Sequence, residues 1–313
     1  MGKLIKIVPP YIHPGNLNFK YSAFVGLKFH GVIVAKSRYP WQIFHHWAFL
    51  YEIPRIYRDN KTAVLMFVEP VSITFDTFPY YATNEVIPFV WDCWPCYYEK
   101  METWFKRHKT RTAIFTSRME MEEMQKRCPH VKMLWCPEAV DASNYKKGKP
   151  LKNRNINLLE FGRSNERVLY KISIDNHVCT YVDGKFIYSN EELYEAMGDA
   201  RITVCLPKSM THPDIAQGVE TLTQRYWEAM LSRMVIIGHA PSELIDICEY
   251  NPVLELPDDK EQINTFILNI LSNIDDYQEL VDRNRQIALE KGLWTIRMKG
   301  IVEWLENIGY SIK

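Results

Sequence analysis

Short apolar runs alternate with polar, helix-forming stretches along the first half of this 313-residue chain, and no other feature restricts its fold as strongly. The runs are rich in β-branched and aromatic residues and lie at 4–8, 32–35, 62–68, 86–91, 112–116 and 131–134. Apolar strands that are separated by helical segments form parallel sheets with helices on their faces. The pattern therefore predicts an α/β fold.

A second series of the same kind follows a break in the pattern. Residues 146–155 are rich in Lys, Asn, Gly and Pro, which is typical of an interdomain linker. Candidate strands then occur at 157–161, 177–181, 202–206, 235–237 and 253–256, with helices at 191–197 and 222–232 and a helical end from 260 onward. The length and the 47% hydrophobic content suit two cores of about 150 residues each. We expect domains over 1–150 and 151–290 and a final helix over 291–313.

Composition argues against several classes of function. Lys plus Arg and Asp plus Glu both number 38, so the formal net charge is zero and no basic field favours nucleic acid. The longest apolar runs fall far below the roughly 20 residues of a membrane helix, and the N-terminus shows no apolar signal segment. We therefore expect a cytoplasmic protein whose seven cysteines are reduced thiols.

The segment 219–238 carries most of the functional information. Glu220 and Glu228 bracket seven residues where a loop becomes a helix, and Thr221 and Thr223 are both suitable N-caps. Backbone N–H groups at the start of a helix bind anions, so this end is a predicted phosphate site. The two carboxylates would then flank a bound phosphate ester.

A competing interpretation of the same helix is a solvated face. Its polar stripe of Gln, Arg, Glu and Ser is common on exposed helices, and two glutamates at this spacing also occur by chance. However, an apolar strand at 235–237 follows directly and a further helix begins near 241–243. This tight helix–strand–helix unit favours the binding interpretation.

With this E-x7-E element the chain resembles the group 1 branch of the GT-B nucleotide-sugar glycosyltransferases, to which many bacterial polysaccharide and lipopolysaccharide assembly enzymes belong. Two further segments, 135–141 and 157–163, are similar to family elements and follow in the same order. The resemblance covers residues 135–305. It implies two facing Rossmann-like domains, the first for the acceptor and the second for the donor, with the last helix crossing back to the first.

The resemblance also implies a donor site. Glu220 would contact hydroxyls of the donor sugar, Glu228 the nucleotide ribose, and Arg163 the diphosphate. The other donor-site candidates are Lys208, Arg225, and Thr221, Leu222 and Thr223, which stand where the family commonly has Gly-Phe-Gly. A leaving diphosphate needs its growing charge neutralised, and no Asp-x-Asp metal motif is visible. We therefore predict a UDP- or GDP-sugar donor and no metal or other cofactor.

Asp92 and His13 complete the predicted catalytic set with Glu220. Both follow predicted strands, at the carboxyl ends where ligands approach open α/β sheets. Asp92 would bind an acceptor hydroxyl or act as base, although an aspartate there also suits a helix cap. The expected reaction moves a hexose, with retention in most of the resembled branch, to a saccharide or lipid-linked saccharide in cell-surface polysaccharide synthesis.

Aromatic and basic residues at 38–47 and 97–109 would suit peripheral contact with the inner membrane, or simply cover a sheet. Two functions of other classes stay open. The first is a thiol–disulfide enzyme, because Cys93 and Cys96 follow a predicted strand as the redox pair of such enzymes does. A zinc site could also draw on Cys93, Cys96, Cys128, His130 or Cys136, but the sequence has no second closely spaced cysteine pair to complete it. The other alternative is a nucleotide-binding protein without transfer activity.

Overall fold

The computed structural model describes residues 2–10, 19–35, 61–78, 80–162, 172–182 and 185–312, which form two compact units. Unit 1 consists of Met1–Pro137, Asp214–Thr221 and Trp294–Lys313, and unit 2 consists of Glu138–Pro213 and Leu222–Leu293. Each unit therefore combines segments that are distant in the sequence.

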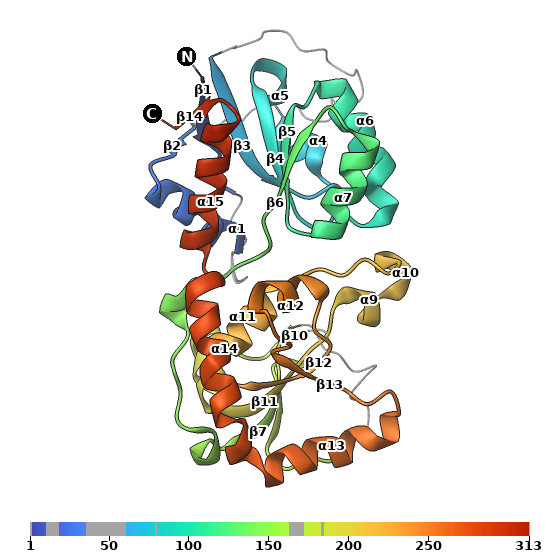
Figure 1. The fold of residues 1–313 in the computed structure, drawn as a ribbon, viewed down its shortest axis with the longest axis vertical. Helices are drawn as coiled ribbons and strands as arrows, with labels where there is room; N and C mark the ends of the chain where they lie inside the picture. The colour runs from blue at the N-terminus through green and yellow to red at the C-terminus, as the bar shows by residue number, and fades with distance from the viewer. Residues whose placement is uncertain are drawn as a thin grey trace. The chain divides into compact units, whose positions relative to one another are not determined.

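Unit 1 is built on a parallel sheet (Figure 1). The strand order is β14-β1-β3-β4-β5-β6, and β2 also pairs with β1. The strands are β1 (Lys3–Ile7), β2 (Ile33–Val34), β3 (Thr62–Val68), β4 (Glu85–Val90), β5 (Thr112–Phe115), β6 (Lys132–Trp135) and β14 (Tyr310–Ser311). All except β14 fall on the six apolar runs of the first series, so the prediction of a parallel α/β sheet is confirmed.

Helices cover both faces of this sheet. They are α1 (Phe19–Phe29), α4 (Ile73–Thr77), α5 (Tyr80–Thr83), α6 (Tyr98–His108), α7 (Arg118–Arg127) and α15 (Trp294–Asn307), and α10 (Pro213–Ala216) straddles the division between the units. On one face, α6 buries Met101 and Phe105 in a core shared with β3, β4 and β5. α1 and α15 lie side by side on the other face, although they come from opposite ends of the chain (Figure 1).

Unit 2 contains a smaller sheet in which every pairing is also parallel. The strand order is β8-β7-β11-β12-β13, with β7 (Ile156–Glu160), β8 (His177–Cys179), β11 (Ala200–Cys205), β12 (Val235–Gly238) and β13 (Val253–Glu255). A separate antiparallel pair joins β9 (Tyr181–Val182) to β10 (Lys185–Phe186). When the strands of the main sheet are numbered by their order in the chain, their order across the sheet is 2-1-3-4-5. This is the strand order of the flavodoxin-like doubly wound fold.

The helices of unit 2 include one that is buried almost all round. They are α8 (Asn190–Asp199), α9 (Lys208–Thr211), α11 (Gln224–Leu231), α12 (Ser242–Cys248), α13 (Lys260–Ser272) and α14 (Gln278–Lys291). In α11, every residue except Arg225 is buried, including Tyr226 and Trp227 at 0% exposure. Among the described residues, none of the helices combines the length and apolar character needed to cross a bilayer.

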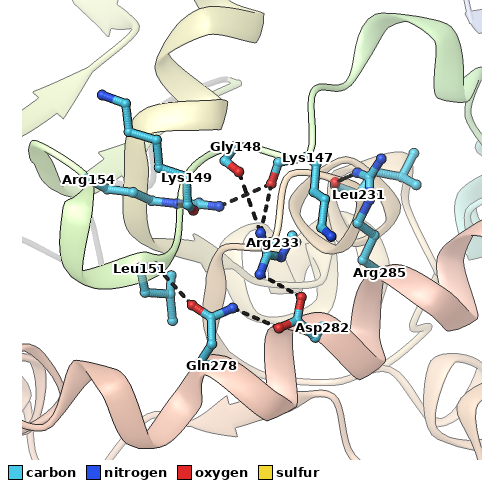
Figure 2. A network of polar contacts seen from close by, with 10 residues as sticks. All are labelled: Lys147, Gly148, Lys149, Leu151, Arg154, Leu231, Arg233, Gln278, Asp282 and Arg285. Atoms are coloured by element: carbon cyan, nitrogen blue, oxygen red, sulfur yellow. Dashed lines mark hydrogen bonds and ion pairs between the residues drawn. The ribbon is translucent and has the colours of Figure 1, made fainter.

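The segment 146–155, which the sequence suggested as a linker, packs within unit 2 (Figure 2). Arg154 is 1% exposed, and its guanidinium donates to the carbonyl oxygens of Lys149 at 2.9 Å, Ala200 at 2.6 Å and Lys147 at 3.4 Å. Nearby, Arg233 forms an ion pair with Asp282 of α14 at 2.6 Å. The segment is held in place because its own carbonyl groups satisfy a buried arginine.

Candidate functional site

The carboxyl ends of β7 and β11 form the topological switch point of unit 2. The chain proceeds from β7 to the edge strand β8 on one side and later to β11 on the other. In open α/β sheets, ligands bind at the point where the strand order reverses, outside the carboxyl ends of the strands. This location is the first place in unit 2 to look for a ligand site.

Arg225 of α11 reaches this switch point. Gly162, two residues beyond β7, has a φ of +82°, and a Cβ placed on it would lie 3.3 Å from Arg225 Cδ. The Arg225 charge also opposes the effect of burial on Cys205 at the end of β11, where burial raises the thiol pKa to about 12. Nη1 of Arg225 and Nε2 of the adjacent Gln224 are buried and have no hydrogen-bond partner among the described residues.

Glu228 lies one turn further along α11 and is 2% exposed. The Tyr145 hydroxyl donates to its Oε1 at 2.6 Å. Burial raises the pKa of the Glu228 carboxyl, and the hydrogen bond from Tyr145 and the charge of Arg225 oppose that rise. Gln224 and Ser232 of the predicted polar stripe are also buried, at 4% and 1% exposure, so the stripe is not a solvated face.

The start of α11 differs from the predicted phosphate site. Its N-cap Thr223 makes no capping bond through its side chain. The N–H of Leu222 donates to a carboxylate oxygen of Glu243 at 3.0 Å, and the N–H of Gln224 donates to one of Glu138 at 3.0 Å. A phosphate placed on these amides would meet two carboxylates, so the free N–H groups expected over 221–224 are not all available for it.

Of the remaining predicted donor residues, Lys208 belongs to unit 2 and Thr221 to unit 1. Lys208 begins α9 just after β11, near the same carboxyl edge as Arg225, and is half-buried. Thr221 is the last residue of the segment that belongs to unit 1, whereas Leu222 begins the return to unit 2. Among the other predicted donor residues, Leu222 is 1% exposed and contributes its side chain to the core.

Glu220 belongs to unit 1, so the two glutamates of the E-x7-E element fall in different compact units. Its backbone is fixed by two contacts: the Ser117 hydroxyl donates to its carbonyl oxygen at 3.2 Å, and its N–H donates to Met119 Sδ at 3.4 Å. The segment before it is held by packing of Ala216 and Val219 against Trp94. Glu220 itself is half-buried.

Asp92 is exposed and lies just past the carboxyl end of β4, with a φ of +53°. A left-handed backbone is uncommon outside glycine, and Asp is one of the residues that tolerate it. The N-cap of the helical turn that follows is Trp94, so Asp92 does not occupy that cap position. Two further residues of the predicted site, His13 and Arg163, lie outside the described residues.

The cysteine pair beside Asp92 has properties opposite to those of a redox site. Cys93 is fully buried and Cys96 is exposed, and both are free thiols. Burial raises the pKa of the Cys93 thiol well above its ordinary value, whereas a reactive cysteine needs a lowered pKa to form the thiolate. The thiol–disulfide alternative is therefore not favoured.

Comparison with known proteins gives similarity at the level of structure. No family model matches the sequence, and no curated protein matches it. A sucrose-phosphate synthase from Thermosynechococcus elongatus has a similar structure, with a TM-score of 0.62 at 10% identity over 98% of this chain and 99% of that one. A glycosyltransferase from Rickettsia africae ESF-5 gives a TM-score of 0.58 at 9% identity, covering 98% of both chains.

A third similar structure is that of Anabaena HepE in complex with UDP and glucose, with a TM-score of 0.52 at 9% identity. The similarity covers 98% of this chain and 100% of HepE. Together with the two parallel sheets, these similarities over nearly the full chain define the fold as the GT-B type. At such low sequence identity they establish the fold alone.

Proposed function

We propose that this protein is a glycosyltransferase that moves a sugar from a nucleoside-diphosphate sugar to an acceptor hydroxyl. The observation that carries the proposal is Nη1 of Arg225 at the switch point of unit 2, which is buried and has no hydrogen-bond partner among the described residues. A buried donor without an acceptor is unfavourable unless a ligand supplies one. Support also comes from the GT-B fold and from HepE, which was solved with UDP and glucose.

The roles follow from the chemistry of a departing diphosphate. Its negative charge grows as the glycosidic bond breaks, so cations fixed beside it stabilise the transition state. Arg225, Lys208 and Arg163 would serve this purpose. Glu228, already held by Tyr145, would accept hydrogen bonds from the ribose hydroxyls. The buried position of Glu228 strengthens such bonds because little water competes for the carboxylate.

The remaining residues belong to the sugar and the acceptor. Glu220 would hold hydroxyls of the transferred sugar, and Asp92 and His13 would bind or deprotonate the acceptor hydroxyl. We propose a hexose donor, a retaining outcome, and a saccharide or lipid-linked saccharide acceptor at the cytoplasmic face of the membrane, in cell-surface polysaccharide synthesis. No metal is needed in this scheme, because arginine and lysine neutralise the diphosphate.

Thermal unfolding with a panel of nucleoside diphosphates tests the donor site. UDP, GDP or a related diphosphate should raise the unfolding temperature, because a ligand that binds only the folded protein stabilises it. Arg225→Ala should lower the affinity for that diphosphate about 10- to 100-fold, the equivalent of one lost charge-assisted hydrogen bond. Arg283→Ala removes the same charge from an exposed position on α14 and should leave the affinity unchanged.

The absence of stabilisation by any diphosphate would refute the donor assignment. Equal losses in Arg225→Ala and Arg283→Ala would show a general charge effect instead of a site.

A second pair of variants separates a transferase from a binding protein. Glu220→Gln should spare binding of the bare diphosphate but reduce turnover of the sugar nucleotide, because Glu220 is assigned to the sugar. Arg163→Ala should impair both diphosphate binding and turnover, with a rate loss on the order of 10²–10³. Arg163 is assigned to the diphosphate, whose negative charge grows as the glycosidic bond breaks. Steady-state kinetics and diphosphate titrations on the folded variants measure this contrast, and equal effects would mean that the two roles are wrongly assigned.

A further inference from the structure

Three side chains with metal-binding atoms meet on neighbouring strands of unit 2. In the parallel pair β7 and β8, Glu160 lies directly opposite Cys179, and His177 precedes Cys179 by two positions. Residues two apart in a strand point to the same face of the sheet, and so do partners that lie opposite each other. The strand register therefore places a carboxylate, an imidazole and a thiol on one face.

The three ligand atoms converge on one point. His177 Nε2 lies 2.8 Å from Glu160 Oε1 and 3.4 Å from Cys179 Sγ, and the Sγ to Oε1 distance is 3.8 Å. A catalytic cysteine–histidine–carboxylate relay would use the two different ring nitrogens, one toward each partner. Here the same nitrogen faces both partners, so the arrangement does not suit such a relay.

We propose that Glu160, His177 and Cys179 bind a Zn²⁺ ion. Zinc takes tetrahedral sites of N, S and O ligands, with bond lengths that separate N and O by about 3.3 Å and place S about 3.5 Å from each. The observed separations lie within about 0.5 Å of these values, a difference that small side-chain rotations remove. A thiolate and an imidazole together favour Zn²⁺ over Mg²⁺ or Ca²⁺, which prefer oxygen ligands.

The position of the site supports access for an ion. β8 is the edge strand of its sheet, and the side chain of His177 is 22% exposed while that of Glu160 is 10% exposed. Three protein ligands leave the fourth position of a tetrahedral ion to water or to a substrate atom. Bound zinc would tie the edge strand β8 to β7 at the end of the strand that leads into Gly162.

Zinc titration of the purified, metal-free chain tests this proposal. Competition with a chromophoric chelator should give about one Zn²⁺ per chain, and Co²⁺ in its place should show the thiolate-to-cobalt charge-transfer absorbance of a cysteine ligand. Cys179→Ser should abolish that absorbance. His177→Gln and Glu160→Gln should each weaken zinc binding at least about tenfold.

Cys96→Ser is the matched control, because Cys96 is an exposed thiol of unit 1. It should leave both the zinc affinity and the cobalt spectrum unchanged. A chain that binds no zinc, or one whose zinc affinity survives both His177→Gln and Glu160→Gln, would overturn the proposal, and so would loss of binding in Cys96→Ser. If Cys179→Ser fails to fold, the two other variants decide the result. No nucleotide enters the experiment, so its result is independent of the proposed transferase activity.

Discussion

The two ends of β7 and β11 carry arginines in opposite circumstances. At the amino ends, every side-chain nitrogen of the buried Arg154 donates to a backbone carbonyl oxygen. Figure 2 shows Arg154 beside two of these partners, Lys147 and Lys149. At the carboxyl ends, Nη1 of Arg225 is buried with no partner in the described part of the chain. A buried cation is tolerated when its donors are satisfied. The donors of Arg154 are therefore satisfied within the protein, whereas Nη1 of Arg225 lacks an acceptor among the described residues.

We propose that this difference separates an arginine that maintains the fold from one that binds the diphosphate. Burial and the neighbouring Arg233 lower the pKa of Arg154 to about 10, which still leaves it charged at neutral pH. Its partners are carbonyl groups of a surface segment and of β11, so Arg154 joins parts of the fold. Nη1 of Arg225 makes no such hydrogen bond among the described residues. Four substitutions test this contrast.

Arg154→Ala should have the largest effect on stability. The substitution leaves three carbonyl oxygens without their donor, and hydrogen bonds to charged groups contribute about 1.5–3 kcal/mol each, so we expect a loss of about 3 kcal/mol or more. Urea unfolding measures the change. Lys152→Ala, at an exposed position of the same segment, should stay within about 0.5 kcal/mol of wild type. A small effect of Arg154→Ala would remove the distinction between the two ends.

Glu228→Gln should alter the pH dependence of stability. Burial raises the pKa of the Glu228 carboxyl in the folded protein above its ordinary 4.5. The folded state therefore holds this proton more tightly, and the stability it contributes is complete below about pH 4.5 and lost as the pH rises through the raised pKa. Glutamine cannot ionise, so the variant should lose less stability over that range.

Unfolding curves at a series of pH values compare Glu228→Gln with wild type. Parallel profiles would mean that Glu228 does not titrate with a raised pKa. Diphosphate affinity should fall about tenfold in the same variant, because the ribose loses a charged acceptor.

Gly162→Ala should destabilise by about 1–2 kcal/mol, because a left-handed backbone is unfavourable for a residue with a Cβ. The added methyl also crowds Arg225, so diphosphate affinity should fall as well. Gly300→Ala is the control: no atom of the described residues lies within 4 Å of its added Cβ, and alanine inside helix α15 should stabilise by about 0.5–1 kcal/mol. Denaturant unfolding gives both values, and a neutral Gly162→Ala would show that the turn relaxes easily.

Arg225→Ala should have the smallest effect on stability, less than about 1 kcal/mol, since Nη1 is buried and has no hydrogen bond to lose among the described residues. Its effect should instead appear in the diphosphate titration. Loss of several kcal/mol in urea unfolding, with affinity intact, would place Arg225 in the same structural class as Arg154.

Much of the fold follows from local patterns in the sequence. Apolar runs and polar breaks predict the strands of both sheets except β14, because period and composition are properties of a short window. The segment 146–155 shows the limit of this reasoning. Its composition is typical of a linker, but its carbonyl groups surround Arg154, and that contact depends on tertiary packing.

The site was less predictable for the same reason. Glu228 and Arg225 stand out in the sequence, and their roles in binding stay predictions. Tyr145, Glu138 and Glu243, which contact Glu228 or the amides at the start of α11, come from other segments of the chain, and their local sequence does not indicate these contacts. The cluster of Glu160, His177 and Cys179 depends on the strand register, since the carboxylate comes from another strand.

The pairing of β1 with β14 bears on how the chain folds during synthesis. β1 is translated before unit 2, whereas its neighbour β14, with Lys3 opposite Tyr310, is translated after unit 2 together with α15. N-terminal domains usually fold first during translation, and contacts between distant residues form slowly. Unit 1 cannot complete its sheet until unit 2 has been synthesised, so unit 2 is free to fold while unit 1 is still unfinished.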